Sequence, residues 1–394
     1  MTESIYILGG ARTPMAEYVG ALKDFTAVAL GVVAAKEALR RSRIAPSEVE
    51  HVVMGNAQQT SADSIYGARH VGLKAGIPHE VPALTVNRLC GSGIQSVVSA
   101  AHLMRAGEAR LTLAGGMESM SQAPFVVRGA REGLRLGAGR LEDSLMAALL
   151  DSQCNLYMAN TAELLAERYG ITREASDEYA LRSQRAAEAA YRAGKLQEEI
   201  VPVEVPARNG SMLFSEDDHR RPETTLEALS KLRPAFGRDG MVTGGNASGI
   251  VDGGAALVLA TESLVKERKL IPMGRVVSWA YAGVPPEIMG IGPAPATREA
   301  LGKAGLALSD MDRIEVNEAF APQYLAVEKE LGLDRDKTNV NGGAIALGHP
   351  LGATGTRLVL TLLHELRREK LRYGLATACI GGGQGIAMIV ERAG

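Results

Sequence analysis

The sequence has few aromatic residues: Phe, Tyr and Trp together make up 4% of its 394 residues. Hydrophobic residues still amount to 46%, so a sizeable core has to be built mainly from Ala, Val, Leu and Ile. Charged residues amount to 22%, and with that hydrophobic share they exclude a chain that is disordered throughout. The length predicts two or three domains rather than one.

Cysteine is scarce, and the net charge is low. The three cysteines, Cys90, Cys154 and Cys379, are too few and too far apart for a disulfide scaffold, and they favour a reducing compartment. Because the sequence contains no CxxC or HxxxH pair, no metal site is expected. A net charge of −2 argues against a protein that binds nucleic acid through bulk charge.

Long apolar segments are missing as well. No run approaches the roughly 18 to 20 residues of a membrane span. Residues 1–10 lack the basic and apolar regions of a signal peptide. We therefore expect a cytoplasmic protein without a membrane span.

The sequence does contain short β-branched runs that alternate with longer segments rich in Ala, Leu and Glu, which favours an α/β fold with a parallel or mixed sheet. Strands are predicted over residues 4–8, 51–54, 84–86, 111–114, 255–260, 274–282, 314–316, 339–340, 374–378 and 386–390. Helices are predicted over residues 27–41, 94–106, 161–169, 173–193, 295–304, 322–331 and 355–368.

Segments of the first part of the chain have counterparts, in the same order, near its end. Residues 34–56 align without gaps with residues 296–318, and both predict a helix, a Ser-containing turn and a strand. The two other pairs of similar segments are 85–87 with 339–341 and 111–116 with 375–381. One such similarity could arise by chance between Ala-rich helices, but three in order indicate a duplication.

The duplication predicts two similar α/β halves with one insertion. The N-terminal half comprises residues 1–116 and 250–270, and the C-terminal half comprises residues 271–394. Residues 117–249 have no counterpart, and their Pro and Gly punctuation indicates an inserted loop domain.

Cys90 lies where a β-type run ends and an apolar helix begins. The unpaired N–H groups and the positive dipole end of that helix would favour a thiolate over a thiol. Gly91 and Gly93 would let a substrate approach the backbone. The alternative is a buried structural cysteine in a tight strand–helix turn.

His349 and Cys379 lie in two further glycine-rich turns. The turn with His349 precedes a helix and could also cradle phosphate, but neither GxxxxGK[ST] nor a GxGxxG in the required context occurs. The duplication places Cys90 and His349 at equivalent turns, where they could face a shared cleft. Two thiols and one imidazole beside backbone N–H groups suit acyl transfer.

Asn317 ends another predicted strand, directly before a helix that has Pro322 near its start. It could cap that helix. It could instead orient a catalytic water or His349.

These motifs together resemble the thiolase family, and within it most of all the 3-ketoacyl-CoA thiolases. They span essentially the whole chain in family order: GARTP (10–14), NRLCGSGIQ (87–95), GGMESMS (115–121), NASG (246–249), NEAF (317–320), GGAIALGHP (342–350) and CIGGGQG (379–385). The resemblance implies the thiolase fold, in which two duplicated halves form α/β/α/β/α layers around the active site and the inserted loop domain helps to bind CoA. It also implies a homodimer or homotetramer, coenzyme A as a substrate, no permanently bound cofactor and no metal.

The resemblance further implies roles for individual residues. Cys90 matches the nucleophile that carries the acyl thioester, His349 the base that activates it, and Cys379 the acid/base that exchanges a proton with the acetyl Cα. Asn317 matches the residue whose water, with His349, stabilises the enolate oxygen. The backbone N–H groups of Cys90 and Gly381 match the oxyanion hole.

Within the insertion, Arg221 and Ser248 match positions that contact CoA, and Met158 matches a position near the reacting acyl group. One departure concerns chain length. Short-chain acetoacetyl-CoA thiolases carry His-Met-Gly in the loop domain, whereas Tyr157, Met158 and Ala159 stand here. This favours the broader range of the thiolases of fatty acid metabolism.

Three alternatives stay open: a short-chain-specific acetyl-CoA acetyltransferase, a decarboxylating ketosynthase and an inactive CoA-binding homologue. Ketosynthases usually pair the cysteine with two histidines or with His and Asn, so the turn at Cys379 argues against them. The presence of Cys90, His349, Cys379 and Asn317 argues against an inactive homologue.

Overall fold

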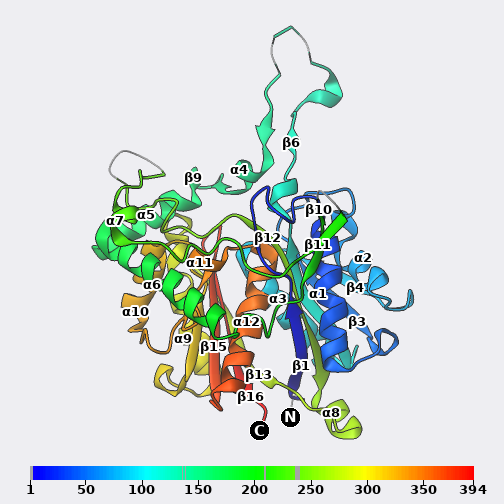
Figure 1. Ribbon diagram of the computed structural model, residues 1–394. Coiled ribbons are helices and arrows are strands. Elements are labelled where there is room, and N and C mark those ends of the chain that lie inside the picture. The colour runs from blue at the N-terminus through cyan, green and yellow to red at the C-terminus, as the bar shows by residue number, and fades with distance from the viewer. Residues whose placement is uncertain (1–2, 135, 138, 208–209, 236–239) are drawn as a thin grey trace.

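The computed structural model describes residues 3–134, 136–137, 139–207, 210–235 and 240–394 (Figure 1). The strands of the main sheet are β1 (Ile5–Arg12), β2 (Ala16–Glu17), β3 (His51–Gly55), β4 (Ala83–Val86), β5 (Leu111–Glu118), β12 (Val251–Thr261), β13 (Gly274–Gly283), β14 (Arg313–Val316), β15 (Tyr373–Ile380) and β16 (Gln384–Arg392). The helices of the two halves are α1 (Ala27–Ser42), α2 (Gly67–Lys74), α3 (Ser92–Arg105), α8 (Glu262–Arg268), α9 (Pro293–Ala304), α10 (Ala321–Leu331), α11 (Ala344–Leu347) and α12 (Leu351–Arg368).

Shorter 3₁₀ helices connect these elements: η1 (Pro46–Glu48), η2 (Ser64–Tyr66), η3 (Leu89–Gly91), η4 (Met120–Gln122), η5 (Ala130–Glu132), η6 (Pro286–Ile291) and η7 (Leu308–Asp310). The segment between β5 and β12 adds β6 (Phe125–Val126), β7 (Glu142–Asp143), α4 (Ser144–Ala148), β8 (Leu150–Asp151), β9 (Leu156–Tyr157), α5 (Met158–Tyr169), α6 (Arg173–Arg192), β10 (Val203–Ala207), β11 (Gly210–Phe214) and α7 (Leu226–Ser230).

The strand order of the main sheet is nearly symmetric about its centre. It runs β14-β15-β16-β13-β1-β12-β5-β3-β4, with β2 paired to β12. In each half a central strand, β1 or β13, is followed outward by two long antiparallel neighbours and then by a parallel strand. The halves join where Ile5 and Ile7 of β1 pair with Val276 and Gly274 of β13. The mixed α/β fold built from two similar halves is confirmed.

The repeated segments fold alike down to the turn that joins helix and strand. In the first half α1, η1 and β3 follow one another, and in the second half α9, η7 and β14 do so. The backbone N–H of Ala45 donates to Glu48 at 2.7 Å, and that of Ala307 donates to Asp310 at 2.8 Å. In both halves, therefore, the carboxylate three positions after the alanine holds the backbone at the start of the turn.

Helices α3 and α12 pack against each other at a pair of glycines. A Cβ on Gly93 would lie 2.4 Å from the backbone N of Thr356, and a Cβ on Gly355 would lie 2.4 Å from the backbone N of Ile94. Both glycines stand in the first turns of their helices, so only glycine lets the two N-terminal ends come this close. Because Cys90 and His349 immediately precede these two helices, this contact brings them together.

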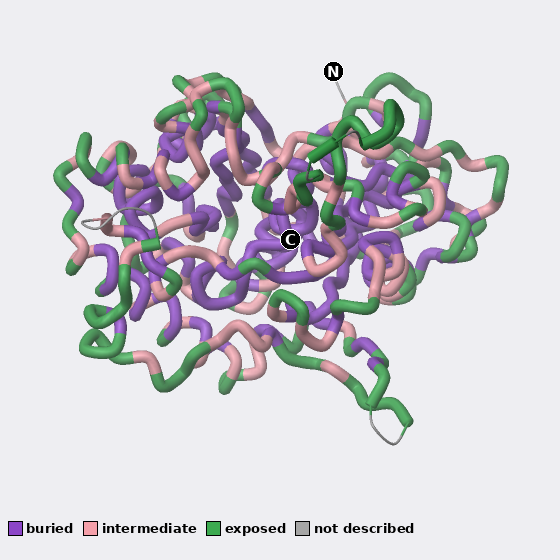
Figure 2. Tube along the Cα trace, turned by 90° about the horizontal axis from the view of Figure 1, so that it is seen from above, coloured by how far each residue is buried: buried purple, intermediate pink, exposed green. Residues whose placement is uncertain are grey.

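The core surrounds these two helices. Leu358, Leu362, Val97 and Val98 are fully buried or nearly so and belong to one apolar cluster with residues of β1, β12, β15 and β16. Figure 2 shows buried backbone concentrated in the middle of the molecule and exposed backbone around its rim. Aromatic residues contribute little to this core, as their scarcity indicates.

One predicted strand, over residues 339–340, is wrong. Asn339 has a φ of 48°, in the left-handed region, and ends the extended conformation after a single bridge between Thr338 and Ile314. Its side chain instead takes part in the pairing: Oδ1 accepts from the N–H of Val316 at 2.9 Å, and Nδ2 donates to the carbonyl of Val316 at 3.0 Å. Asparagine is one of the few residues that tolerates this conformation. Its side-chain amide therefore makes the hydrogen bonds to Val316 that the backbone of a paired strand would otherwise make.

The other predicted strands and helices are present with shifted ends. The shifts reach four residues: α12 begins at Leu351 instead of Gly355, and β1, β5 and β12 are each extended by four residues at one end. Helix α2 was not predicted, because its sequence GARHVGLK carries two glycines that mask the helical pattern. Strand β5 runs through Glu118, two residues beyond the expected end of the first part of the N-terminal half.

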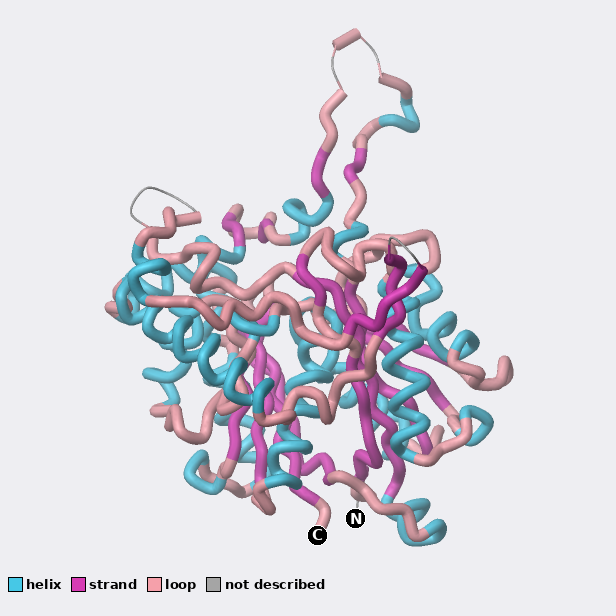
Figure 3. Tube along the Cα trace, in the orientation of Figure 1, coloured by secondary structure: helices cyan, strands magenta, loops and turns pink. Residues whose placement is uncertain are grey.

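The segment between β5 and β12 lies over the top of the two halves and sends out a narrow arm (Figures 1 and 3). The arm carries the short strands β6 and β7, which pair with each other. Further along, α5 packs on α10 and α6 on α11, so this segment covers the C-terminal half. Across the described ranges, none of the helices combines the length and the apolar character that crossing a membrane requires.

Candidate active site

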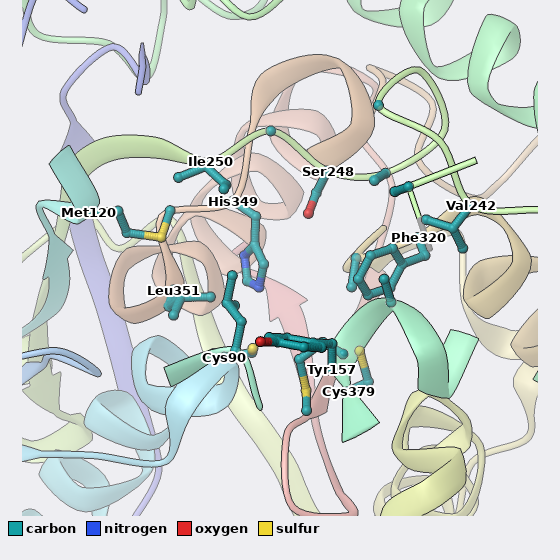
Figure 4. A pocket seen from close by; sticks show the side chains of 18 of the residues that line it. Cys90, Met120, Tyr157, Val242, Ser248, Ile250, Phe320, His349, Leu351 and Cys379 are labelled. Atoms are coloured by element: carbon teal, nitrogen blue, oxygen red, sulfur yellow. The ribbon is translucent and has the colours of Figure 1, made fainter. Parts of the chain in front are cut away.

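A cavity of about 250 Å³ opens between the two halves and the segment above them. Figure 4 shows Cys90, His349 and Cys379 facing into it, with Phe320 on the same side as Cys379 and Ser248 above them in this view. Its walls are otherwise apolar, with side chains that include Met120, Leu149, Met158, Val242, Ile250, Met289 and Leu351. The structure thus places both thiols and the imidazole in one pocket.

A strained turn presents Cys90 to this cavity. Leu89, the residue before it, has a φ of 45°, which non-glycine residues rarely adopt. Local hydrogen bonds hold the turn: the N–H of Leu89 donates to Asn87 Oδ1 at 2.9 Å, and the N–H of Arg88 donates to Ser92 Oγ at 2.9 Å. The hydroxyl of Ser92 in turn donates to the carbonyl of Leu89 at 2.7 Å. Cys90 then stands in η3, directly before the first turn of α3.

Backbone N–H groups converge on the Cys90 sulfur. They come from Cys90 itself and from Gly381, in the turn that follows β15. That turn depends on glycine, because Gly382 and Gly383 have φ values of 81° and 83°. Arg88 ties the two turns together by donating to Gln384 Oε1 at 2.9 Å. Donors placed this way can stabilise negative charge that develops beside the sulfur.

Both thiols are protonated in the free protein. Burial raises the pKa of Cys90 to about 11, against the lowering effect of the two backbone N–H groups. Burial and then the neighbouring Cys90 raise the pKa of the Cys379 thiol well above its usual value. Backbone N–H groups favour the thiolate of Cys90, but desolvation of the charged form outweighs them, so the net effect is a raised pKa.

His349 is neutral, and its contacts select one tautomer. Burial, with a smaller contribution from the Arg357 cation, lowers the pKa of His349 to about 3. Nδ1 lies 2.6 Å from Thr354 Oγ1, whose own hydroxyl donates to the carbonyl of Pro350 at 3.0 Å. With its proton used in that way, Thr354 accepts from Nδ1–H. Nε2 therefore keeps its lone pair, as a general base requires.

Asn317 lies beside that lone pair. Its Nδ2 is 3.3 Å from His349 Nε2, and its Oδ1 is buried without a hydrogen-bond partner among the described residues. The backbone of Asn317 donates to the carbonyl of Thr377 at 2.9 Å, which fixes the residue at the end of β14 next to β15. Capping α10 is not its role here, because the residue directly before that helix is Phe320 and no side chain caps it.

The loop-segment residues stand in different places. Ser248 lines the cavity, and Met158 lies at its base, with Sδ 3.2 Å from the position that a Cβ on Gly381 would take. Arg221 lies outside the cavity lining, with 55% of its side chain exposed and an ion pair to Glu17. Glu17 also accepts from His219 Nδ1 at 2.8 Å.

The imidazole of His219 connects this charged cluster to the rim of the cavity. A Cβ on Gly249, which lines the cavity, would lie 2.6 Å from that ring. Arg221, Glu17 and His219 therefore stand at the rim rather than beside the thiols.

Two residues near the catalytic cluster were missed in the sequence. Thr354 stands five positions after His349, and a threonine four residues after a proline that starts a helix points back into the first turn. Glu118 is fully buried and accepts N–H groups from Ala57, Gln58 and Gly352, so it ties the start of α12 to the loop after β3. Burial raises the pKa of Glu118 to about 7.

A metal site is not indicated in the part of the chain that the structure describes. No three side chains of His, Cys, Asp or Glu gather there in a way that could hold an ion.

Two similar α/β halves that bring a thiol, an imidazole and a second thiol to one apolar cavity define the class of thiol-dependent acyltransferases. Family models narrow this further. Residues 5–263 match the N-terminal domain of thiolase, and residues 270–392 match the C-terminal domain. The chain belongs to the thiolase family.

Known relatives are similar over their whole length. The human mitochondrial 3-ketoacyl-CoA thiolase is 53% identical over 392 residues, which is 99% of each chain. The acetyl-CoA acetyltransferase of Escherichia coli (strain K12) is 49% identical over 388 residues, which is 98% of each chain. The crystal structure of the human mitochondrial enzyme in complex with CoA superimposes with a TM-score of 0.97, covering 100% of this chain and 99% of that one.

Proposed function

We propose that this enzyme cleaves 3-ketoacyl-CoA with coenzyme A to give a shortened acyl-CoA and acetyl-CoA, and that it also catalyses the reverse condensation. The observation that carries this proposal is that Cys90, His349 and Cys379 line one cavity, with the N–H groups of Gly381 and Cys90 directed at the Cys90 sulfur. Coenzyme A is then a substrate, and no cofactor stays bound.

In the first half of the reaction the Cys90 sulfur attacks C3 of the substrate while its proton moves to Nε2 of His349. The C2–C3 bond then breaks, and its electron pair stays on C2 as the enolate of acetyl-CoA. The Cys379 thiol protonates C2, which releases acetyl-CoA and leaves an acyl thioester on Cys90. The high pKa of Cys379 suits this step, because the group keeps its proton until a strong carbon base is present.

In the second half a new CoA binds and gives its thiol proton to the Cys379 thiolate. The CoA sulfur attacks the thioester carbonyl, and Cys90 leaves and recovers its proton from His349. Both half-reactions pass through an oxyanion beside Cys90, where the N–H groups of Cys90 and Gly381 would stabilise it. Every proton is returned, and because acetyl-CoA leaves before the new CoA binds, the kinetics are ping-pong.

Asn317 would act on the enolate. Its Nδ2 lies beside the lone pair of His349, and its Oδ1 has no hydrogen-bond partner among the described residues. A water held by this amide and by the imidazole would donate to the enolate oxygen. This proposal gives the buried, unpaired amide oxygen a function.

CoA would enter along the wall that carries Ser248 and would pass Arg221 at the rim. The exposed guanidinium of Arg221 suits a phosphate, although Glu17 holds it in the free protein. Met158 would lie beneath the reacting acyl group. The crystal structure of the human relative is named as a complex with CoA, which supports CoA as the ligand.

We favour 3-ketoacyl substrates of broad chain length over a short-chain acetoacetyl-CoA thiolase. Tyr157 lines the cavity at the position where short-chain enzymes carry histidine, and the rest of the lining is largely apolar. The alternative is an enzyme specific for the short-chain substrate acetoacetyl-CoA. It has support from the Escherichia coli relative, which is 49% identical and is named an acetyl-CoA acetyltransferase.

The direct test measures thiolysis and the covalent intermediate. Wild-type protein mixed with acetoacetyl-CoA and CoA should consume the substrate, followed as the loss of its enolate absorbance. Mass spectrometry after incubation with an acyl-CoA should show one acyl group on Cys90. Cys90→Ser should lose both signals, whereas the matched Cys154→Ser should keep both, because Cys154 lies outside the cavity. An acyl group on Cys154, or no activity with any 3-ketoacyl-CoA, would refute the proposal.

A second variant separates the two thiols. Cys379→Ser should still form the acyl-enzyme from an acyl-CoA, because the CoA thiolate that leaves is a weak base and can depart without a proton from Cys379. It should lose condensation, because a serine hydroxyl is a much weaker acid and base at carbon. A condensation rate equal to that of the wild type would exclude a proton-transfer role for Cys379.

We further propose that the protein assembles as a homodimer or homotetramer through the arm. Phe125, Leu134 and Leu141 on the arm are 63%, 61% and 71% exposed, which is unusual for large apolar side chains of a monomer. Light scattering of the wild type and of a Phe125→Ser/Leu141→Ser variant would test this. A monomeric wild type, or an unchanged mass in the variant, would contradict it.

The proposed domain division and location are as follows. Residues 1–116 with 250–270 form the N-terminal half, 117–249 the CoA-binding loop domain and 271–394 the C-terminal half. We keep the cytoplasm as the proposed location because Cys90, Cys154 and Cys379 are free thiols. The human relative is named as mitochondrial, another reducing compartment, so fractionation of the source cells decides the matter.

A further inference from the structure

The two backbone N–H groups that converge on the Cys90 sulfur come from different halves of the molecule. Cys90 precedes α3 of the N-terminal half, and Gly381 follows β15 of the C-terminal half. In the main sheet the halves are joined where β1 pairs with the first residues of β13. Gln384, which follows the Gly381 turn, pairs instead with Gly283, the last residue of β13. The backbone pairing between the halves therefore lies far along the sheet from the two donors.

Apolar contacts bring the two turns close together but do not orient them. A Cβ on Gly91 would lie 2.6 Å from Cδ1 of Ile380, and a Cβ on Gly381 would lie 3.2 Å from Cδ1 of Leu89. Each side therefore packs an aliphatic side chain against a glycine of the other. Such packing has no preferred direction, so it does not by itself fix where the N–H of Gly381 points.

Arg88 supplies directional bonds between the turns. Its Nε donates to Oε1 of Gln95 at 2.8 Å, and its Nη1 donates to Oε1 of Gln384 at 2.9 Å. Gln95 lies in the first turn of α3 and donates to Ser99 at 2.9 Å. Gln384 is the first residue of β16 and pairs with Ile380. Because the guanidinium is planar and rigid, one side chain thus fixes the start of α3 relative to the start of β16.

An aromatic ring holds this guanidinium in place. Its central carbon lies 4.5 Å from the ring centre of Tyr281, on β13, and Arg88 is half-buried. Arg105 makes the same kind of contact, with its guanidinium carbon 4.5 Å from the ring centre of Trp279. Arg105, however, is the last residue of α3 and stands away from both turns. The chain thus offers two arginines on similar aromatic supports, of which Arg88 connects the turns.

The distance between the two N–H donors matters because both have to reach one oxygen. An oxyanion is stabilised by donors about 2.7 to 3.1 Å from the position that it occupies. A displacement of about 1 Å can cost roughly 100-fold in rate. A bridge that spans the halves at this point would therefore affect the rate without touching the substrate.

We propose that Arg88 is a positioning residue of the oxyanion hole: its guanidinium holds the Gly381 turn of the C-terminal half at a fixed distance and orientation from the Cys90 turn of the N-terminal half. The kinetic consequence rests on the thiolase function proposed above. The geometric consequence does not, because the N–H of Gly381 also contacts the Cys90 sulfur in the free protein.

The kinetic test replaces the guanidinium by an unbranched apolar side chain. Arg88→Met should lower kcat for thiolysis of acetoacetyl-CoA about 10- to 100-fold, because both half-reactions pass through the oxyanion. KM should stay close to the wild-type value, since Arg88 is not part of the cavity lining. Arg88→Lys, which can still donate to Gln384, should retain more activity than Arg88→Met. The matched control Arg105→Met removes a similar cation–aromatic contact and should leave kcat unchanged.

Gln384→Met removes the acceptor instead of the donor and serves if Arg88→Met does not fold. It should also lower kcat with little change in KM. Combining it with Arg88→Met should add little to the loss, because both substitutions break the same bridge. A loss in the double variant equal to the product of the two single losses would show that the residues act independently and would overturn the proposal.

The geometric test uses the free protein and iodoacetamide at pH 9, with the modified cysteine identified by mass spectrometry. The two N–H groups lower the pKa of Cys90, so displacing the Gly381 N–H raises that pKa further and reduces the thiolate fraction. Alkylation of Cys90 should therefore be several times slower in Arg88→Met and in Gln384→Met than in wild type or in Arg105→Met. General loosening of the site would instead let water reach the thiol, lower its pKa and speed the reaction.

The outcomes separate this proposal from the proposed function. If wild-type protein cleaves no 3-ketoacyl-CoA, the proposed function is wrong, and the alkylation rates still decide the role of Arg88. Wild-type kcat in both Arg88→Met and Gln384→Met, or faster alkylation in either of them, would overturn the proposal. An equal loss of kcat in Arg105→Met would overturn it as well, because that loss would come from the aromatic contact and not from the bridge.

Discussion

The hydrogen bond between His349 and Thr354 allows a quantitative prediction. Thr354 is fully buried on the first turn of α12, and its Oγ1 lies 2.6 Å from Nδ1 of His349. Valine has nearly the same shape as threonine but cannot accept a hydrogen bond. Thr354→Val should therefore leave the fold intact while removing the hydrogen bond of Nδ1, which is the reason for the tautomer that makes Nε2 basic.

The size of the effect follows from the burial of the ring. A buried donor left without its acceptor costs about 1 to 3 kcal/mol. If the ring avoids this by moving its proton to Nε2, it has to reverse that shift before it can accept the proton of Cys90. The free enzyme then avoids the penalty and the transition state does not, so the barrier rises by this amount, which corresponds to a rate loss of about 5- to 160-fold.

The assay is steady-state thiolysis of acetoacetyl-CoA. Thr354→Val should lower kcat and kcat/KM together, because the lost interaction serves proton transfer rather than CoA binding. Thr354→Ser keeps the hydroxyl and should retain most of the activity. The matched control is Thr361→Val on the same helix, whose Oγ1 donates to Glu199 at 2.8 Å far from the imidazole. It should reduce the free energy of unfolding but not kcat.

Two results would refute this reasoning. One is a Thr354→Val enzyme with wild-type kcat, which would show that the threonine does not select the tautomer. The other is an equal loss of kcat in Thr354→Val and Thr361→Val, which would show that the effect comes from general loosening of α12.

Three further predictions follow from the packing and the charges. Gly93→Ala should lower the free energy of unfolding by about 1 to 3 kcal/mol and reduce activity, because its Cβ would force α3 and α12 apart. The control Gly302→Ala, in open space on α9, should change the free energy of unfolding by less than about 1 kcal/mol, both measured by chemical denaturation. Glu315→Ala should cost about 3 to 5 kcal/mol in the same measurement, since it leaves the fully buried Arg357 without the carboxylate that lies 2.8 Å away. Alkylation of Cys90 by iodoacetamide in the free enzyme should keep accelerating beyond pH 9, because the pKa of Cys90 is raised to about 11 and the thiolate fraction grows up to that pH. A rate that reaches a plateau below pH 8 would contradict the burial argument.

Much of the local structure was predictable because it depends on neighbours in sequence. The alternation of β-branched and Ala-rich runs predicted the strands and helices of both halves, and the gapless match of residues 34–56 with 296–318 predicted their duplication. The prediction from local sequence pattern was wrong where the backbone adopts an uncommon φ value. Asn339 reads as part of a strand, but its left-handed conformation and its side-chain pairing with Val316 appear only when the neighbouring strand is present.

The candidate site divides in the same way. The sequence alone indicated the residues that are proposed to carry the chemistry: Cys90, His349 and Cys379 stand in glycine-rich turns, and Asn317 follows a strand. Only the tertiary structure decided their protonation. A helix N-terminus predicts a thiolate at Cys90, yet burial raises its pKa to about 11, because the desolvation of a charge depends on everything packed around it and not on the adjacent residues.

The tertiary structure also decided how the substrate is accommodated. The cavity at Cys90 brings together residues from segments far apart in the chain, such as Cys90, Ser248 and His349. No periodicity or spacing encodes the volume left between such segments. The sequence therefore determined the chemistry and the duplicated frame, and the packing of the two halves and the loop segment determined the charge states and the space for the acyl chain.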